Sequence, residues 1–241
     1  MSTFLWGVFP YIAIATFVVG LIWRYRTNRF SWTTRSSQVY ESRWLRVGGP
    51  LFHVGLVLAF GGHLMGVLVP KAWTDAIGIE QHTYHLVAVG GGWVSGLMIG
   101  VGYGILMARR VLVPAVRRAT SRGDVVMYLT LTVVLLSGMV NTLTTTLSEA
   151  YNYREGISPW FRSVLALNPD VALMVDAPWS FQLHGFAAFF LLLIWPFTRL
   201  VHAFSVPLGY LTRPYVVYRS PNRQPAPQVR VPAGMWRPPS A

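Results

Sequence analysis

Cysteine is absent from this 241-residue chain, and acidic residues are few, with 8 Asp and Glu against 20 Lys and Arg. Without thiolates the chain can hold no cysteine-ligated zinc or iron–sulfur cluster and can attach no c-type haem covalently. Any redox centre must therefore be held by histidine or lie in a partner. Only 12% of the residues are charged and 53% are hydrophobic, and the apolar residues gather in long runs. This composition is typical of a membrane protein.

Five apolar runs are each long enough to cross a hydrocarbon core, which takes about 20 helical residues. The sequence therefore predicts an all-α integral membrane protein with a five-helix transmembrane domain over residues 1–218. Residues 219–241 form a Pro- and Arg-rich tail that is expected to be disordered or bound to a partner. The predicted spans are residues 4–23, 49–69, 84–107, 125–147 and 179–204.

The third span carries a glycine at every fourth position. Such a series places small residues on one helical face and lets a neighbouring helix approach closely. We therefore expect a close helix–helix contact along Gly92, Gly96, Gly100 and Gly104.

The basic residues indicate the orientation of the chain. The connections after spans one, three and five hold six, five and six Lys and Arg, whereas those after spans two and four hold one and two. The positive-inside rule therefore places the N-terminus outside and the C-terminus in the cytoplasm. The net charge of +12 is then a topology signal and a docking surface for a protein partner, and it does not indicate nucleic-acid binding.

Two of the predicted spans carry two histidines each, and an imidazole without a partner is costly in lipid. His53 and His63 lie in the second span, and His184 and His202 lie in the fifth. These spans run in opposite directions, so we expect His53 near His202 on the cytoplasmic side and His63 near His184 on the outer side. Along unbroken helices the axial separations would be about 15 Å and about 27 Å, a mismatch that a kink at Pro196 would relieve.

Facing imidazoles in a helical bundle are suitable axial ligands for haem. Zinc and di-iron sites would need tetrahedral His/Cys sets or Glu-x-x-His motifs, which the sequence lacks. For any one histidine, hydrogen-bonded packing is the alternative. Four histidines in two antiparallel spans favour two bis-histidine haem sites stacked across the membrane.

Several short motifs are spread over residues 1–218. They are Pro10-Tyr11-Ile12, Ser36-Ser37-Gln38, Leu51-Phe52-His53, Gly62-His63, Pro196 to His202, Ser205-Val206-Pro207 and Tyr210-Leu211-Thr212-Arg213. In these motifs the chain resembles the gamma subunit, a b-type cytochrome, of membrane-bound respiratory nitrate reductase. The resemblance implies two haem b groups, the inner one bound by His53 and His202 and the outer one by His63 and His184.

The resemblance also implies an activity and partners. The family oxidises a quinol, here expected to be menaquinol from the quinone pool, at the outer face of the cytoplasmic membrane and releases its protons outside. Electrons pass to a cytoplasmic iron–sulfur (beta) subunit and from there to a molybdenum (alpha) subunit that reduces nitrate. A chain without cysteine cannot hold those next carriers itself.

The expected quinol site departs from the family pattern. Well-known members carry a lysine at the start of the third span, where this sequence offers Gln81, His82 and His85. We predict that His82 or His85 binds the quinol and accepts a proton, because histidine titrates near neutrality; an interfacial histidine facing lipid headgroups is the alternative. Gly62 is predicted to let the quinol approach the outer haem, and Arg199 to pair with an inner haem propionate.

Two other functions are compatible with the sequence. A related haem b subunit could serve a sulfur or heterodisulfide reductase instead of nitrate reductase. A non-redox anchor or transporter would usually show coupling carboxylates or an inverted repeat near mid-membrane, and the sequence shows neither.

Overall fold

The structure, a computed structural model, describes residues 1–32, 36–148 and 151–204, and this part of the chain is helical without a strand. Five of its helices are long and apolar enough to cross a membrane, as the all-α prediction with five spans requires. They are Phe4–Thr27, a π-helical turn continued by α1 (Phe9–Thr27); Arg43–Leu68, which contains α2 (Arg43–His63); α4 (Gln81–Leu112); α6 (Arg122–Leu147); and Trp179–Phe197, which begins with α9 (Trp179–Ile194).

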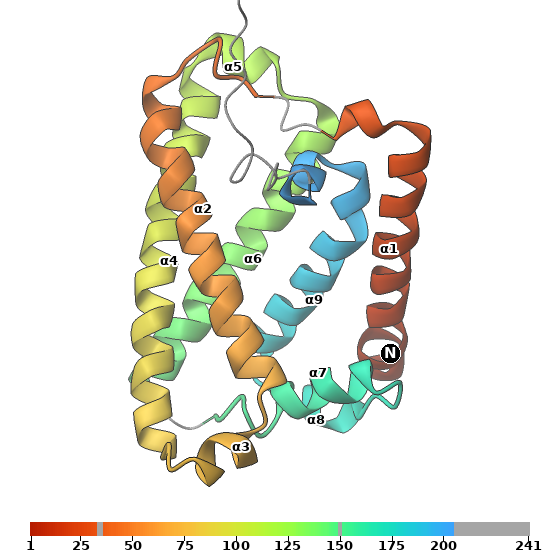
Figure 1. Ribbon diagram of the computed structural model, residues 1–241, viewed down its shortest axis with the longest axis vertical. Helices are drawn as coiled ribbons and strands as arrows, with labels where there is room; N and C mark the ends of the chain where they lie inside the picture. Colours follow the sequence, from red (N-terminus) through yellow and green to blue (C-terminus); the bar gives the residue numbers. More distant parts are fainter. Residues whose placement is uncertain (33–35, 149–150, 205–241) are drawn as a thin grey trace, which may run out of the picture. The chain divides into compact units, whose positions relative to one another are not determined.

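Four short helices lie at the two ends of the bundle (Figure 1). We call the end with α5 (Pro114–Arg118) the α5 end. The α3 end holds α3 (Lys71–Ala76), α7 (Ile157–Leu165) and α8 (Val171–Val175). The arginine-rich connections after α1 and α4 lie at the α5 end (Figure 1), which is therefore the predicted cytoplasmic side. The predicted tail, residues 219–241, lies outside the described residues.

The fifth span, predicted over residues 179–204, is interrupted near Pro196, where the sequence suggests a kink. α9 ends at Ile194, and two 3-10 segments follow, Trp195–Phe197 and Arg199–Phe204. Pro196 has no backbone N–H to donate, and its ring hinders the continuation of an α-helix. The second histidine of this span is consequently carried by a 3-10 segment and not by α9.

An arginine of the first span stabilises this break. Arg24 in α1 is 9% exposed, and its Nη1 donates to the carbonyl of Pro196 at 2.6 Å and to that of Thr198 at 2.8 Å. Buried backbone carbonyls that lose their helical hydrogen bond need another donor. Arg24 therefore compensates for the interruption of the fifth span.

The closest helix–helix contact joins α2 and α4 through two glycines. A Cβ added at Gly102 would lie 2.5 Å from the backbone nitrogen of Phe52, and one added at Gly55 would lie 2.9 Å from the backbone nitrogen of Ile99. Distances this short leave no room for any side chain larger than hydrogen. The two helices pack backbone to backbone, and this contact fixes the helix that carries His53 and His63.

The predicted glycine face of the third span makes only half of its expected contacts. Gly92 and Gly96 lie against Thr142 and Met139 of α6, whereas a Cβ added at Gly100 or Gly104 would meet nothing within 4 Å. α4 contacts α6 at Gly92 and Gly96 and contacts α2 at Gly102. No single face of α4 therefore makes the close contacts along its whole length. Gly102, which lies outside the four-residue series, instead makes the close contact with the backbone of α2.

A second buried arginine secures the connection between α1 and α2 at the α5 end. Arg109, at the end of α4, is 2% exposed and donates from Nε to Glu41 Oε2 at 2.6 Å. It also donates to the hydroxyl and the carbonyl of Ser37, both at 2.9 Å, and to the carbonyl of Glu41 at 2.6 Å. The connection is therefore held to α4 by one side chain.

Candidate functional site

The structure brings the four histidines together as two pairs. The rings of His63 and His184 are 5.9 Å apart between centroids, with planes inclined by 25°. The rings of His53 and His202 are 6.1 Å apart, with planes inclined by 69°. Each pair joins one histidine of α2 to one histidine of the fifth span.

The same ring nitrogen of each of these four histidines faces a backbone carbonyl. A carbonyl can only accept, so Nδ1 carries a proton, and in a neutral imidazole the lone pair then lies on Nε2. Metal-binding histidines are typically oriented in this way by a bond from the other nitrogen. The Nδ1-to-oxygen distances are His53 to Gly49, 2.8 Å; His63 to Ala59, 2.6 Å; His184 to Val134, 3.1 Å; and His202 to Arg199, 2.6 Å.

These distances fit one metal ion between the rings of each pair. With Fe–N bonds of about 2 Å and a nitrogen about 1 Å from each ring centre, two axial imidazoles have centroids about 6 Å apart. Among the described residues, no group of three or more His, Cys, Asp or Glu is arranged to hold a metal ion. A site with two imidazoles and no further protein ligand suits the axial positions of haem better than a zinc or di-iron centre.

The surroundings of His184 place a small residue against its ring. A Cβ added at Gly138 of α6 would lie 3.1 Å from the ring, so glycine lets the imidazole approach that helix without displacement. The hydroxyl of Ser137 lies 3.1 Å from its Nδ1 as well. Sequence analysis missed both residues, because a glycine and a serine inside an apolar run are also common in helix packing.

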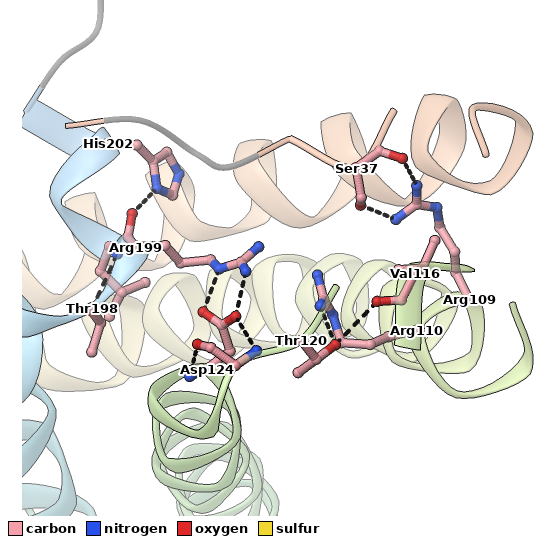
Figure 2. A network of polar contacts seen from close by, with 11 residues as sticks. Ser37, Arg109, Arg110, Val116, Thr120, Asp124, Thr198, Arg199 and His202 are labelled. Carbon is pink, nitrogen blue, oxygen red and sulfur yellow. Dashed lines mark hydrogen bonds and ion pairs between the residues drawn. The ribbon is translucent and has the colours of Figure 1, made fainter. Parts of the chain in front are cut away.

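Arg199 lies at the α5 end and pairs with an acidic residue of α6 (Figure 2). Its Nε donates to Oδ1 of Asp124 at 2.8 Å and its Nη2 to Oδ2 at 2.6 Å, and both side chains are largely buried. Two of its N–H groups are thus committed to Asp124. The propionate contact expected from the sequence stays a prediction.

The residues predicted to bind quinol lie at the α3 end, where α2 ends and α4 begins (Figure 1). His82 is exposed and His85 half-buried, both near the start of α4. A Cβ added at Gly62 would meet nothing within 4 Å, so there is open space beside the residue that precedes His63. The roles of these three residues in quinol binding stay predictions.

A buried arginine that the sequence analysis did not single out organises the start of α4. Arg154 is 3% exposed and donates to Gln81 Oε1 at 3.1 Å and to Thr74 Oγ1 at 2.6 Å. Its guanidinium carbon lies 3.7 Å from the ring centre of Tyr84. Arg154 therefore fixes the first turn of α4 on either side of His82. In the sequence it is one arginine in a loop that also holds four acids, so nothing marks it as buried.

Arg154 carries its charge in a buried position, and within the described ranges no carboxylate makes an ion pair with it. Burial and a hydrogen bond with Tyr84 raise the pKa of the neighbouring Tyr153, so this phenol stays neutral. A buried cation favours negative charge in its surroundings.

The five candidate spans and the two facing histidine pairs are the features of a multi-pass membrane protein in which imidazoles face each other at two levels. The family model described as nitrate reductase gamma subunit matches residues 2–221. The chain belongs to this family, the gamma subunits of respiratory nitrate reductase.

Several named relatives agree with this assignment. The nitrate reductase gamma chain of Bacillus subtilis is 41% identical over 215 residues, covering 89% of this chain and 96% of the relative. The respiratory nitrate reductase 1 gamma chain of Escherichia coli is 29% identical, covering 91% of this chain and 98% of the relative. The nitrate reductase-like protein NarX of Mycobacterium tuberculosis is 46% identical over 222 residues, but this chain spans only 34% of its length.

Proposed function

We propose that this chain is the dihaem b, quinol-oxidising membrane subunit of a respiratory nitrate reductase, embedded in the cytoplasmic membrane. The proposal rests on the two pairs of facing imidazoles. The ring centroids are 6.1 Å apart in the His53–His202 pair and 5.9 Å apart in the His63–His184 pair. His63 and His184 would hold the outer haem b, and His53 and His202 the inner one. Bound haem supplies reversible one-electron redox chemistry within the membrane.

In this proposal the residues at the α3 end bind the quinol and move its protons. A quinol loses two protons on oxidation, so a group that accepts them speeds the reaction. His82 and His85 are the proposed acceptors, and the open space beside Gly62 lets the quinol ring approach His63. Arg154 holds the start of α4 and favours the deprotonated quinol oxygen through its charge. Protons leave on the outer side.

The proposed partners dock at the α5 end. The connections after α1 and α4 are rich in arginine, and the described part of the first is fixed by Arg109. A fixed basic surface suits a cytoplasmic iron–sulfur (beta) subunit, which in turn serves a molybdenum (alpha) subunit where nitrate is reduced. The electrons of the quinol leave the membrane on this side.

This orientation predicts a labelling pattern that the absence of cysteine makes easy to read. Ile77 lies between α3 and α4 and is 74% exposed, and Arg118 is exposed at the end of α5. In intact cells, a membrane-impermeant maleimide should label the Ile77→Cys variant at once and the Arg118→Cys variant only after the membrane is opened. Labelling in the reverse order would contradict the orientation.

The function is tested on the assembled complex in membranes. We expect two b-type components in a redox titration monitored by absorption, both reduced when a menaquinol analogue is added and both reoxidised by nitrate. If quinol reduced both components but nitrate did not reoxidise them, the proposed haem sites would stand, and nitrate reductase would be excluded as the partner. A complex without b-type absorption would overturn the proposal.

A further inference from the structure

We propose that Asp124 is a positioning residue for the inner histidine pair, acting through Arg199 on the ring of His202. The inference rests on the proposed function, since it concerns how the chain holds one of the two proposed haem ligands. It assigns Arg199 a role different from the propionate contact expected from the sequence.

The segment that carries His202 depends on anchors outside itself. Residues Arg199–Phe204 form a 3-10 helix beyond the break at Pro196. Such helices have poorer hydrogen-bond geometry than α-helices and are short for that reason. Arg24 holds the start of the segment by donating to the carbonyls of Pro196 and Thr198. Beyond Thr198, Val201 is fully buried and Phe204 packs against Phe17 and Trp195, and a polar anchor acts at Arg199 as well.

Asp124 supplies the polar anchor through a continuous series of short contacts (Figure 2). Its carboxylate accepts two N–H groups of Arg199 at 2.8 Å and 2.6 Å, and the carbonyl of Arg199 accepts Nδ1–H of His202 at 2.6 Å. A bidentate arginine–carboxylate pair fixes orientation as well as distance. Since the side chain and the carbonyl belong to one residue, holding the guanidinium also holds the acceptor of the histidine.

Asp124 is itself rigidly placed at the start of α6. Its Oδ2 accepts the backbone N–H of Ser121 at 2.9 Å, while its own N–H donates to the hydroxyl of Ser121 at 3.2 Å. This reciprocal capping box ties the carboxylate to the first turn of a 26-residue helix. The position of α6 is thereby transmitted to the ring that faces His53.

The other three histidines have no such dependence. The carbonyls that hold His53 and His63 belong to α2 itself, four residues earlier, and the carbonyl that holds His184 belongs to the middle of α6. A regular helix keeps those acceptors in place. Loss of Asp124 should therefore disturb one histidine pair and leave the other intact.

The test replaces each member of the ion pair in the assembled complex and measures the two b-type components separately. Asp124→Asn keeps a side-chain oxygen for the helix cap but removes the charge, and Arg199→Gln removes the fork. We expect both to change the ferric low-spin resonance of the inner component. They should also halve its content or shift its reduction equilibrium at least tenfold, which is about 59 mV for one electron. The inner component is identified as the one lost in His202→Ala.

A matched control separates positioning from general loosening of the α5 end. Glu41→Gln breaks the other buried ion pair at this end, Arg109 with Glu41 at 2.6 Å, which touches no histidine. We expect it to leave both components at their wild-type potentials. Arg199→Lys, which keeps the charge without the fork, should shift the inner component less than Arg199→Gln, and this milder variant serves if Asp124→Asn does not assemble.

Three outcomes would overturn the inference. Unchanged components in Asp124→Asn and Arg199→Gln would show that Asp124 is not needed to position His202, and would leave the proposed function standing. Equal changes in both components, or the same change in Glu41→Gln, would show only a loosened bundle. A wild-type complex without two b-type components would overturn the inference and the proposed function together.

Discussion

Replacing His63 with alanine is expected to remove one of two b-type components and to abolish the reduction of the other by quinol. The ring of His63 faces that of His184, 5.9 Å away between centroids, and alanine cannot supply the second axial nitrogen. The inner pair, His53 and His202, keeps its own hydrogen bonds. Its component should therefore still be reduced by dithionite. Haem content per polypeptide, measured after extraction, should fall by about half if each pair binds one haem.

His82→Ala is the matched comparison, because His82 lies at the same end of the bundle but outside both pairs. We expect it to keep both components and to slow their reduction by quinol by roughly 100-fold, the usual minimum for loss of a general base. The proposal that the histidine pairs bind haem would be wrong if His63→Ala kept the full absorption of both b-type components. A rate unchanged in His82→Ala would transfer the proton-accepting role to His85.

The sequence alone was enough to predict which histidines face each other, because this prediction needs only two simple rules. The distribution of basic residues predicts the direction of each span, and antiparallel spans place the first histidine of one beside the last histidine of the other. The structure places His53 beside His202 and His63 beside His184. A pattern of charges along the chain is enough for this step because it involves no detail of side-chain packing.

The supports of the histidines could not be predicted in this way. Pro196 suggests a kink, but a sequence does not say which donor satisfies the released carbonyls, and the donor is Arg24, 172 residues away. Similarly, an arginine at a helix end is usually solvated, yet Arg199 is paired and buried against Asp124. Arg154 looks like any loop arginine, although it is buried. Contacts between residues distant in the chain depend on how the helices cross, which periodicity alone does not encode.

Gly102→Ala tests the contact that the glycine periodicity missed. One methyl group at this position would lie 2.5 Å from the nitrogen and 2.8 Å from the Cα of Phe52. Backbone atoms cannot move aside as a flexible side chain can, so α2 must separate from α4. Overpacking of this kind costs about 1–3 kcal/mol. We expect a lower midpoint of unfolding in detergent and loss of haem from both histidine pairs, since His53 and His63 both lie on α2.

Gly100→Ala is the control two residues away on the same helix, where an added Cβ meets nothing within 4 Å. Alanine is favoured over glycine inside a helix by about 1 kcal/mol, so this variant should be as stable as the wild type or slightly more stable. Equal behaviour of the two variants would show that α2 and α4 do not pack backbone to backbone at Phe52. A drop confined to Gly102→Ala would show that the spacing of these two helices, which no motif in the sequence specifies, controls both haem sites together.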